Sequence, residues 1–198
     1  MRRKQSLQQI IDRLKSGGIG VFPTDTLYGL VGSALNQKTV ERIYKVRQRT
    51  PSKPLIVLIS SLEDLRLFGI KPDRETRKIL NQYWPGKVSI ILPTLSNKLI
   101  YLHRRTKTIA FRLPAKADLR RILKKTGPLV APSANPEGQP PAKSIKESKA
   151  YFDDRVDFYL PAQAGLAGKR QTNLPSTLIK ITNGQVKILR PGIVRVKI

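Results

Sequence analysis

Polar side chains that could bind a small molecule interrupt the apolar pattern of the sequence at four places, each beside a predicted strand. At the first place, residues 23–30, Thr24, Asp25 and Thr26 directly follow a predicted buried strand. Loops at strand ends are where α/β proteins usually hold ligands, so two hydroxyls and a carboxylate there suit a polar small molecule. An Asp/Thr turn that caps the next element explains the same residues without a ligand.

The second place is a basic segment, residues 45–54, between a predicted helix and a predicted buried strand. It could hold a phosphate chain, because guanidinium groups make forked contacts with phosphate oxygens. Its cations are Lys45, Arg47, Arg49 and Lys53. The alternative is a solvated helix end, where the helix dipole favours cations. The sequence has no glycine-rich Walker loop, so an ATP site here would not be of the P-loop type.

The third place is the proline-rich stretch of residues 131–140, which lies between predicted elements. Its small residues would let a ligand approach the backbone closely, and Ser133 and Asn135 add a hydroxyl and an amide. We interpret this stretch as a functional loop and not as a domain boundary. A rigid surface loop without a ligand is the alternative.

The fourth place is the open end of a predicted hairpin, and its pairing would bring Ser176 and Arg190 close together. For Arg190 the alternative is an ordinary charge at a strand end. Arg112 is a sharper signal, because it lies inside the apolar segment of residues 110–114. An arginine buried in such a strand needs an anionic partner.

The bulk composition favours one α/β domain spanning residues 1–198, with 39% hydrophobic residues for its core. The absence of cysteine excludes disulfides and thiolate metal sites and favours a cytoplasmic location. A single histidine, His103, argues against a histidine-based metal site. Neither a signal peptide nor an apolar run long enough to cross a bilayer is apparent, so no membrane partner is expected.

The net charge is +25, from 38 Lys and Arg against 13 Asp and Glu. Such a field attracts polyanions, so tRNA or double-stranded RNA is a possible partner. A general basic bias of the source proteome is the alternative. The basic residues outside the four polar places recur in clusters at 2–4, 104–107, 120–125 and 195–197, which could form an outer RNA-binding surface.

Apolar spacing and cap residues predict the elements that must position these side chains. We expect helices between Ser6 and Gly17, at 39–47, from a Ser60/Glu63 capping box to Phe68, after Asp73 toward Tyr83, and at 118–125. Strands are expected at 19–22, 55–59, 88–92, 108–113, 129–131, 156–160, 176–181 and 185–189, with a turn at Asn183-Gly184. This mixture indicates a twisted mixed sheet with helices packed on it.

Taken in order, the segments resemble the YrdC-like family, which includes the bacterial TsaC enzymes. The matching pieces are GGIGVFPTDTLYGLVGSAL, RQRTPSKPLIVLIS, WPGKVSIIL, TIAFRLP, GPLVAPSANPEGQP and STLIKI…ILRPG. Each piece is weak alone, but six in register over residues 17–192 are specific. The resemblance implies an α/β twisted open sheet around a basic cavity.

The resemblance also implies an activity: L-threonylcarbamoyladenylate synthesis. L-threonine, bicarbonate and ATP, with Mg²⁺ accompanying the ATP, would give threonylcarbamoyl-AMP and pyrophosphate. A downstream threonylcarbamoyl-transferase complex would then modify the adenosine beside the anticodon of tRNA. No metal ligand from the protein is implied.

Site residues follow by matching the family's motifs. L-threonine would be held by Thr26, Arg112 and Ser176, with Arg112 on its carboxylate. ATP would be bound by Arg47, Arg49, Lys53, Thr108, Ser133, Asn135 and Arg190. No protein nucleophile is implied, and catalysis would come from positioning by Arg47, Arg49 and Arg112.

Several positions depart from the family pattern. Arg47 stands where the family usually has a lysine, and Glu137 stands where it usually has the serine of the third segment. Pro51, Leu58 and Pro141 also replace residues that are common in the family. The departures keep a non-catalytic RNA-binding protein on the same fold as an alternative. A second alternative is the related domain of hydrogenase-maturation carbamoyltransferases, but their zinc motifs need cysteines that this chain lacks.

Overall fold

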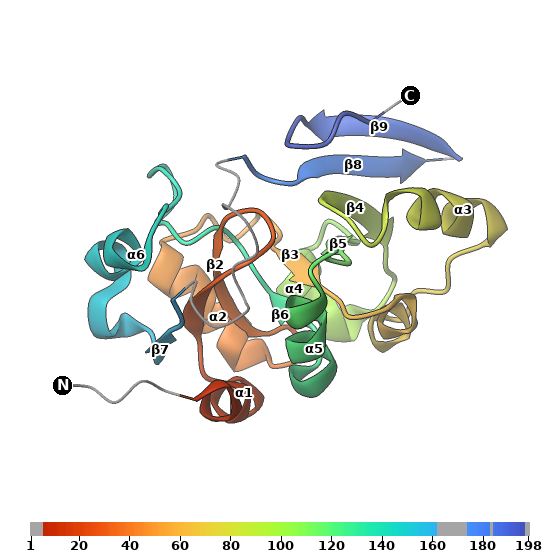
Figure 1. The fold of residues 1–198 in the computed structure, drawn as a ribbon. Coiled ribbons are helices and arrows are strands. Elements are labelled where there is room, and N and C mark those ends of the chain that lie inside the picture. The colour runs from red at the N-terminus through yellow and green to blue at the C-terminus, as the bar shows by residue number, and fades with distance from the viewer. Residues whose placement is uncertain (1–5, 162–173, 183, 197–198) are drawn as a thin grey trace.

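The computed structural model describes residues 6–161, 174–182 and 184–196. Within these ranges nine strands form one mixed sheet in the order β7-β1-β2-β6-β3-β5-β4-β8-β9 (Figure 1). The pairs β1–β7, β3–β5 and β4–β8 are parallel, and the other pairs are antiparallel. The strands are β1 Gly20–Pro23, β2 Tyr28–Ser33, β3 Ile56–Leu58, β4 Val88–Pro93, β5 Thr108–Arg112, β6 Leu129–Val130, β7 Phe158–Tyr159, β8 Thr177–Thr182 and β9 Gln185–Arg190. The predicted α/β class with a mixed sheet is confirmed.

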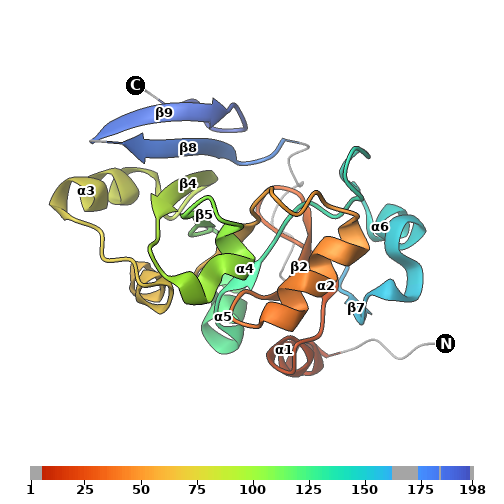
Figure 2. The ribbon, with the colours of Figure 1, turned by 180° about the vertical axis from the view of Figure 1, so that it is seen from behind.

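Helices cover both faces of the sheet, as the two opposite views show (Figures 1 and 2). They are α1 Leu7–Lys15, α2 Gln37–Arg47, η1 Leu62–Phe68, α3 Arg74–Tyr83, η2 Asn97–Leu99, α4 Ile100–His103, α5 Ala117–Thr126, α6 Ile145–Phe152 and η3 Asp153–Arg155, where η marks a 3-10 helix. No helix among the described residues is long and apolar enough to cross a membrane.

Alternation along the strands divides the core into two layers. Phe22, Val31 and Leu58 point to one face and pack with α1 and α5. Their neighbours on the same strands, such as Val21 and Leu30, point to the opposite face, which packs with α2 and α4. The sheet therefore holds its strand ends rigidly between two helical layers.

Two helix ends are fixed by cap residues, of which the sequence predicts Ser6. Ser6 and Gln9 form a capping box at the start of α1: the Ser6 hydroxyl accepts from Gln9 N at 3.2 Å, and the Gln9 side chain accepts from Ser6 N at 2.9 Å. At the end of α2, Gln48 has a left-handed backbone with φ of 51°. The chain thus turns sharply out of α2 into the basic segment that follows.

The predicted capping box of Ser60 and Glu63 is wrong by one residue. The Asp64 carboxylate accepts from Ser60 N at 2.7 Å and from Ser61 N at 3.3 Å, and the helix that follows is the 3-10 helix η1. Ser61 and Asp64 have the same three-residue spacing as Ser60 and Glu63, so the pattern does not distinguish the two registers.

Five elements were not expected. Strand β2 forms within and just after the first polar segment, η2 and α4 precede β5, and α6 and η3 follow the proline-rich loop. The predicted hairpin is present as β8–β9, in which Thr182 lies opposite Gln185. Of its predicted turn, Asn183 lies outside the described residues and Gly184 has a φ of 71°.

Candidate active site

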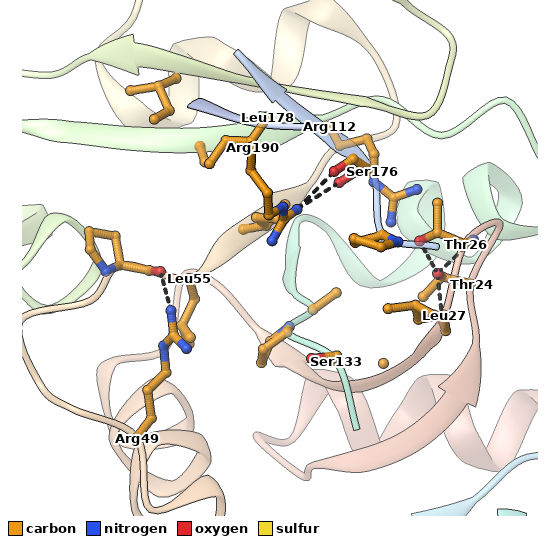
Figure 3. A pocket seen from close by; sticks show the side chains of 18 of the residues that line it. Thr24, Thr26, Leu27, Arg49, Leu55, Arg112, Ser133, Ser176, Leu178 and Arg190 are labelled. Atoms are coloured by element: carbon orange, nitrogen blue, oxygen red, sulfur yellow. Dashed lines mark hydrogen bonds between the residues drawn. The ribbon is translucent and has the colours of Figure 1, made fainter. Parts of the chain in front are cut away.

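A cavity of about 370 Å³ opens beside the first polar segment, along β5, where β3 and β8 begin and β9 ends (Figure 3). It is within the usual size range of small-molecule sites. All four polar places of the sequence contribute side chains to its wall. The predicted site residues that line it are Thr26, Arg47, Arg49, Thr108, Arg112, Ser133, Ser176 and Arg190.

The first segment is both a turn and part of the cavity wall. The Thr24 hydroxyl donates to the Leu27 carbonyl at 2.7 Å and accepts from Thr26 N at 3.2 Å, which closes the turn before β2. Thr26 is buried and lies 3.2 Å from Thr24 between the two hydroxyl oxygens. The turn therefore fixes Thr26 at the wall; the turn interpretation of this segment is confirmed, and ligand binding there stays a prediction.

Arg112 is buried at the end of β5, and its anionic partner in this structure is Asp25. The two side chains form an ion pair in which the exposed fractions are only 4% and 5%. Asp25 Oδ2 and Arg112 Nε have no hydrogen-bond partner, although both are buried. Asp25 was not among the predicted site residues. The signal that could have found it was the need of a buried arginine for a carboxylate.

The β8–β9 hairpin brings Ser176 and Arg190 together, as its predicted pairing required. Arg190 Nη2 donates to the Ser176 carbonyl at 2.9 Å. The Ser176 hydroxyl lies 2.8 Å from the buried hydroxyl of Ser89 on β4, a residue that sequence reasoning missed. Burial, followed by the charges of Arg112 and Arg49, lowers the pKa of Arg190. Several cations thus share this wall of the cavity.

Arg47 is held by the third segment. Its Nε donates to the Asn135 carbonyl at 2.9 Å, and its Nη2 lies 3.5 Å from the Ser133 hydroxyl. Burial, and next the charge of Arg49, lowers the pKa of Arg47 to about 10. The amide of Asn135 donates to the Pro136 and Gln139 carbonyls at 2.8 and 2.7 Å, so Asn135 shapes its own loop behind the cavity wall.

The rest of the basic segment is folded back on itself. Arg49 donates to the carbonyls of Lys53 and Pro54 at 3.1 and 3.2 Å. The Tyr44 hydroxyl donates to the same Lys53 carbonyl at 2.9 Å. Lys53 itself is outside the cavity wall, and its ammonium pairs with Glu137 at 2.5 Å.

Thr108 lines the cavity together with Thr106, which sequence reasoning missed. Their hydroxyl oxygens lie 3.1 Å apart, and the Thr106 hydroxyl donates to the His103 carbonyl at 2.6 Å. Among the residues that the structure describes, no three histidine, aspartate or glutamate side chains gather to hold a metal ion.

The chemical character of the cavity is that of an anion site. Four arginines and several hydroxyls line it, and the Asp25 carboxylate pairs with Arg112. Guanidinium groups in a partly dry cavity bind carboxylates and phosphates strongly. The site therefore suits a ligand that carries several negative groups.

Comparison with known proteins agrees with this fold. A model of the Sua5/YciO/YrdC family, described as telomere recombination, matches residues 12–192. The chain belongs to this family. It is 34% identical over 173 residues to a threonylcarbamoyl-AMP synthase of Marinobacter nauticus, covering 86% of this chain and 88% of that protein.

Two solved structures are similar. Sua5 of P. abyssi, in complex with L-threonine, is 28% identical with a TM-score of 0.81, and the match covers 92% of this chain and 53% of that one. The chain thus spans about half the length of this relative. YciO of E. coli has a TM-score of 0.80 at 23% identity, over 96% of this chain and 90% of that one, and supports the fold alone.

Proposed function

We propose that the chain is an L-threonylcarbamoyladenylate synthase, a nucleotidyltransferase that joins L-threonine, bicarbonate and ATP and releases pyrophosphate. The observation that carries this proposal is the cavity, in which Arg47, Arg49, Arg112 and Arg190 converge with Thr26 and Ser176. Relatives named threonylcarbamoyl-AMP synthase support it over a non-catalytic RNA-binding protein. A protein that bound only RNA would not need this set inside a cavity.

L-threonine binds at the wall made by Thr26, Arg112 and Ser176. Arg112 makes one contact with Asp25 and leaves its Nε without a partner, so the guanidinium keeps donors for the carboxylate of the amino acid. Thr26 and Ser176 are both buried and present hydroxyls to the same cavity. The complex of the P. abyssi relative with L-threonine supports this substrate.

ATP binds in the same cavity beside L-threonine, where Arg47, Arg49, Ser133, Thr108 and Arg190 surround its phosphates. Lys53 reaches the nucleotide from the rim, and Asn135 contributes by holding Arg47. Mg²⁺ enters with ATP as part of the substrate and needs no ligand from the protein.

The reaction needs positioning rather than a protein nucleophile. The amine of L-threonine and bicarbonate give a carbamate and water, and the carbamate is a short-lived anion. One carbamate oxygen then attacks the α-phosphorus, and the bond from that phosphorus to pyrophosphate breaks. The arginines hold the two anions together and offset the charge that develops on the leaving group.

Partners beyond the substrates follow from the product. Threonylcarbamoyl-AMP is a mixed anhydride, so a transferase that acts on tRNA adenosine must consume it before water does. We place that downstream threonylcarbamoyl-transferase complex, and tRNA itself, among the partners of this chain.

The test is pyrophosphate release by the purified chain, with ATP, Mg²⁺, L-threonine and bicarbonate each omitted in turn. Release should require all four. Arg49→Ala should slow it by about 100-fold, since it removes a cation from the phosphate site. Arg74→Ala, which removes an exposed arginine at the start of α3, should leave the rate unchanged. Release that is unaffected by omitting L-threonine would refute the proposal.

A further inference from the structure

The carboxylate of Glu137 accepts hydrogen bonds from two donors of the basic segment, residues 45–54. Its Oε2 accepts from Thr50 N at 2.5 Å, and its Oε1 accepts from the Lys53 ammonium at 2.5 Å. The backbone N–H of Glu137 also donates to the Arg47 carbonyl at 2.8 Å. One residue of the third segment thus contacts the second segment at three points.

The two donors that Glu137 occupies are the kind that bind phosphate. A backbone N–H and a lysine ammonium beside it form an anion site in many phosphate-binding loops. Arg47, Arg49 and Pro54 of the same segment line the cavity, so Thr50 and Lys53 are chain neighbours of lining residues. The Glu137 carboxylate fills them as a phosphate oxygen would.

The contact is ionic under ordinary conditions. Lys53 first, and next the N–H of Thr50, lowers the pKa of Glu137 to about 2, so the carboxylate stays charged at neutral pH. The Glu137 side chain is 23% exposed and that of Lys53 is 57% exposed. An ion pair open to solvent on this scale is weak and can be displaced.

We propose that Glu137 is an internal competitor for the polyphosphate of ATP: its carboxylate occupies Lys53 and Thr50 N–H, and the nucleotide must displace it. This inference rests on the proposed function, because it assumes that phosphates bind at these donors. It makes Glu137 a determinant of affinity for phosphate ligands. Its return to Lys53 and Thr50 N–H then favours the departure of pyrophosphate.

The experiment measures binding of ATP and, separately, of inorganic pyrophosphate by calorimetry. Glu137→Gln keeps the size of the side chain and removes its charge. It should bind both ligands about two- to tenfold more tightly than the unaltered chain. Glu75→Gln is the matched control, because Glu75 forms an ion pair of the same kind with Lys78 on α3, at 3.2 Å. Its affinities should not change.

A double-mutant cycle with Lys53→Ala tests whether Glu137 acts through Lys53. In the Lys53→Ala background, Glu137→Gln should gain much less affinity, because the charged one of the two occupied donors is absent and only the Thr50 N–H remains. A full gain in that background would show that Glu137 acts only through its general charge, and the inference would fail.

Other outcomes would also overturn the inference. Weaker binding by Glu137→Gln would mean that the carboxylate organises the loop for ATP. A loss of affinity seen only with Mg²⁺ present would make Glu137 a metal ligand instead. If no variant binds ATP, the proposed function fails, whereas the pyrophosphate measurements still decide the role of Glu137.

Discussion

Asp25 and Arg112 form the most buried ion pair among the described residues. Removing either partner would leave a buried charge without a counter-ion, at a cost in folding free energy. Two desolvated charges offset each other only while both are present. The sequence predicts that Arg112 needs an anion but not which one, because Asp25 lies 87 residues away in the chain. Only the packing of β5 beside the first segment brings them together.

Asp25→Asn should therefore destabilise the fold. The change leaves the Arg112 charge buried without a counter-ion, so the free energy of unfolding should fall by about 3–5 kcal/mol in urea titrations. Glu75→Gln, which breaks the exposed pair with Lys78, should change it by less than about 1 kcal/mol. A fall of similar size in both variants would contradict the role of burial.

At the scale of elements, strong periodic segments were predictable and weakly patterned ones were not. Helix α1 has buried Ile10, Ile11 and Leu14 on one stripe and follows its prediction closely. Strand β2 contains two glycines and begins inside a polar segment, so its residues resemble a loop. Helix α6 is mostly polar and buries only Ser148 and Phe152, which leaves little apolar pattern to detect.

The same limit applies to the candidate site. Its segments stand out because polar residues follow apolar strands, and eight of the predicted residues do line one cavity. The positions of Lys53 and Asn135 outside that lining depend on Glu137 and on hydrogen bonds within the third segment. Such contacts between loops leave no periodic signal in a sequence.

The hairpin is seated against the cavity by a close approach at Gly192. A Cβ there would lie 2.5 Å from both the Pro175 carbonyl oxygen and Thr177 N, so the backbone would have to shift. Because Ser176 and Arg190 flank this contact, Gly192→Ala should misplace both and slow pyrophosphate release by at least about tenfold. Leu189→Ala, a change at a partly exposed position of β9, is the control and should have little effect. Equal rates in the two variants would contradict this account of the hairpin.

At the scale of the whole molecule, the chain has many more basic residues than line the cavity. Four arginines line the cavity, whereas the chain has 38 basic residues. Of the predicted outer clusters, residues 2–4 and 197 lie outside the described ranges. On α5, Arg120 donates to the Pro114 and Ala115 carbonyls at 2.9 and 2.8 Å and so has a structural role. Arg121, Lys124 and Lys125 are exposed on the same helix.

We therefore expect the triple change of Arg121, Lys124 and Lys125 to Glu to weaken tRNA binding without slowing threonine-dependent pyrophosphate release. Arg120 is left intact, because its reversal would disturb the loop before α5. Lost phosphate contacts release fewer counterions, so the slope of log affinity against log salt should become shallower by about two to three. Filter binding at several salt concentrations measures it. An unchanged slope would mean that this surface is only a solvated helix face.

The pairing of β8 with β4 also affects local unfolding of the β8–β9 hairpin. Unzipping β8 from β4 would carry Ser176 and Arg190 away from the cavity while the remaining strands stay paired. A bound ligand opposes that local unfolding by RT ln(1 + [L]/Kd), which is about 2.7 kcal/mol at a hundredfold excess over Kd. The amide hydrogens of β8 would then exchange with solvent about 100 times more slowly. Ligand binding would therefore slow amide hydrogen exchange in the hairpin but not in the strands between β1 and β6.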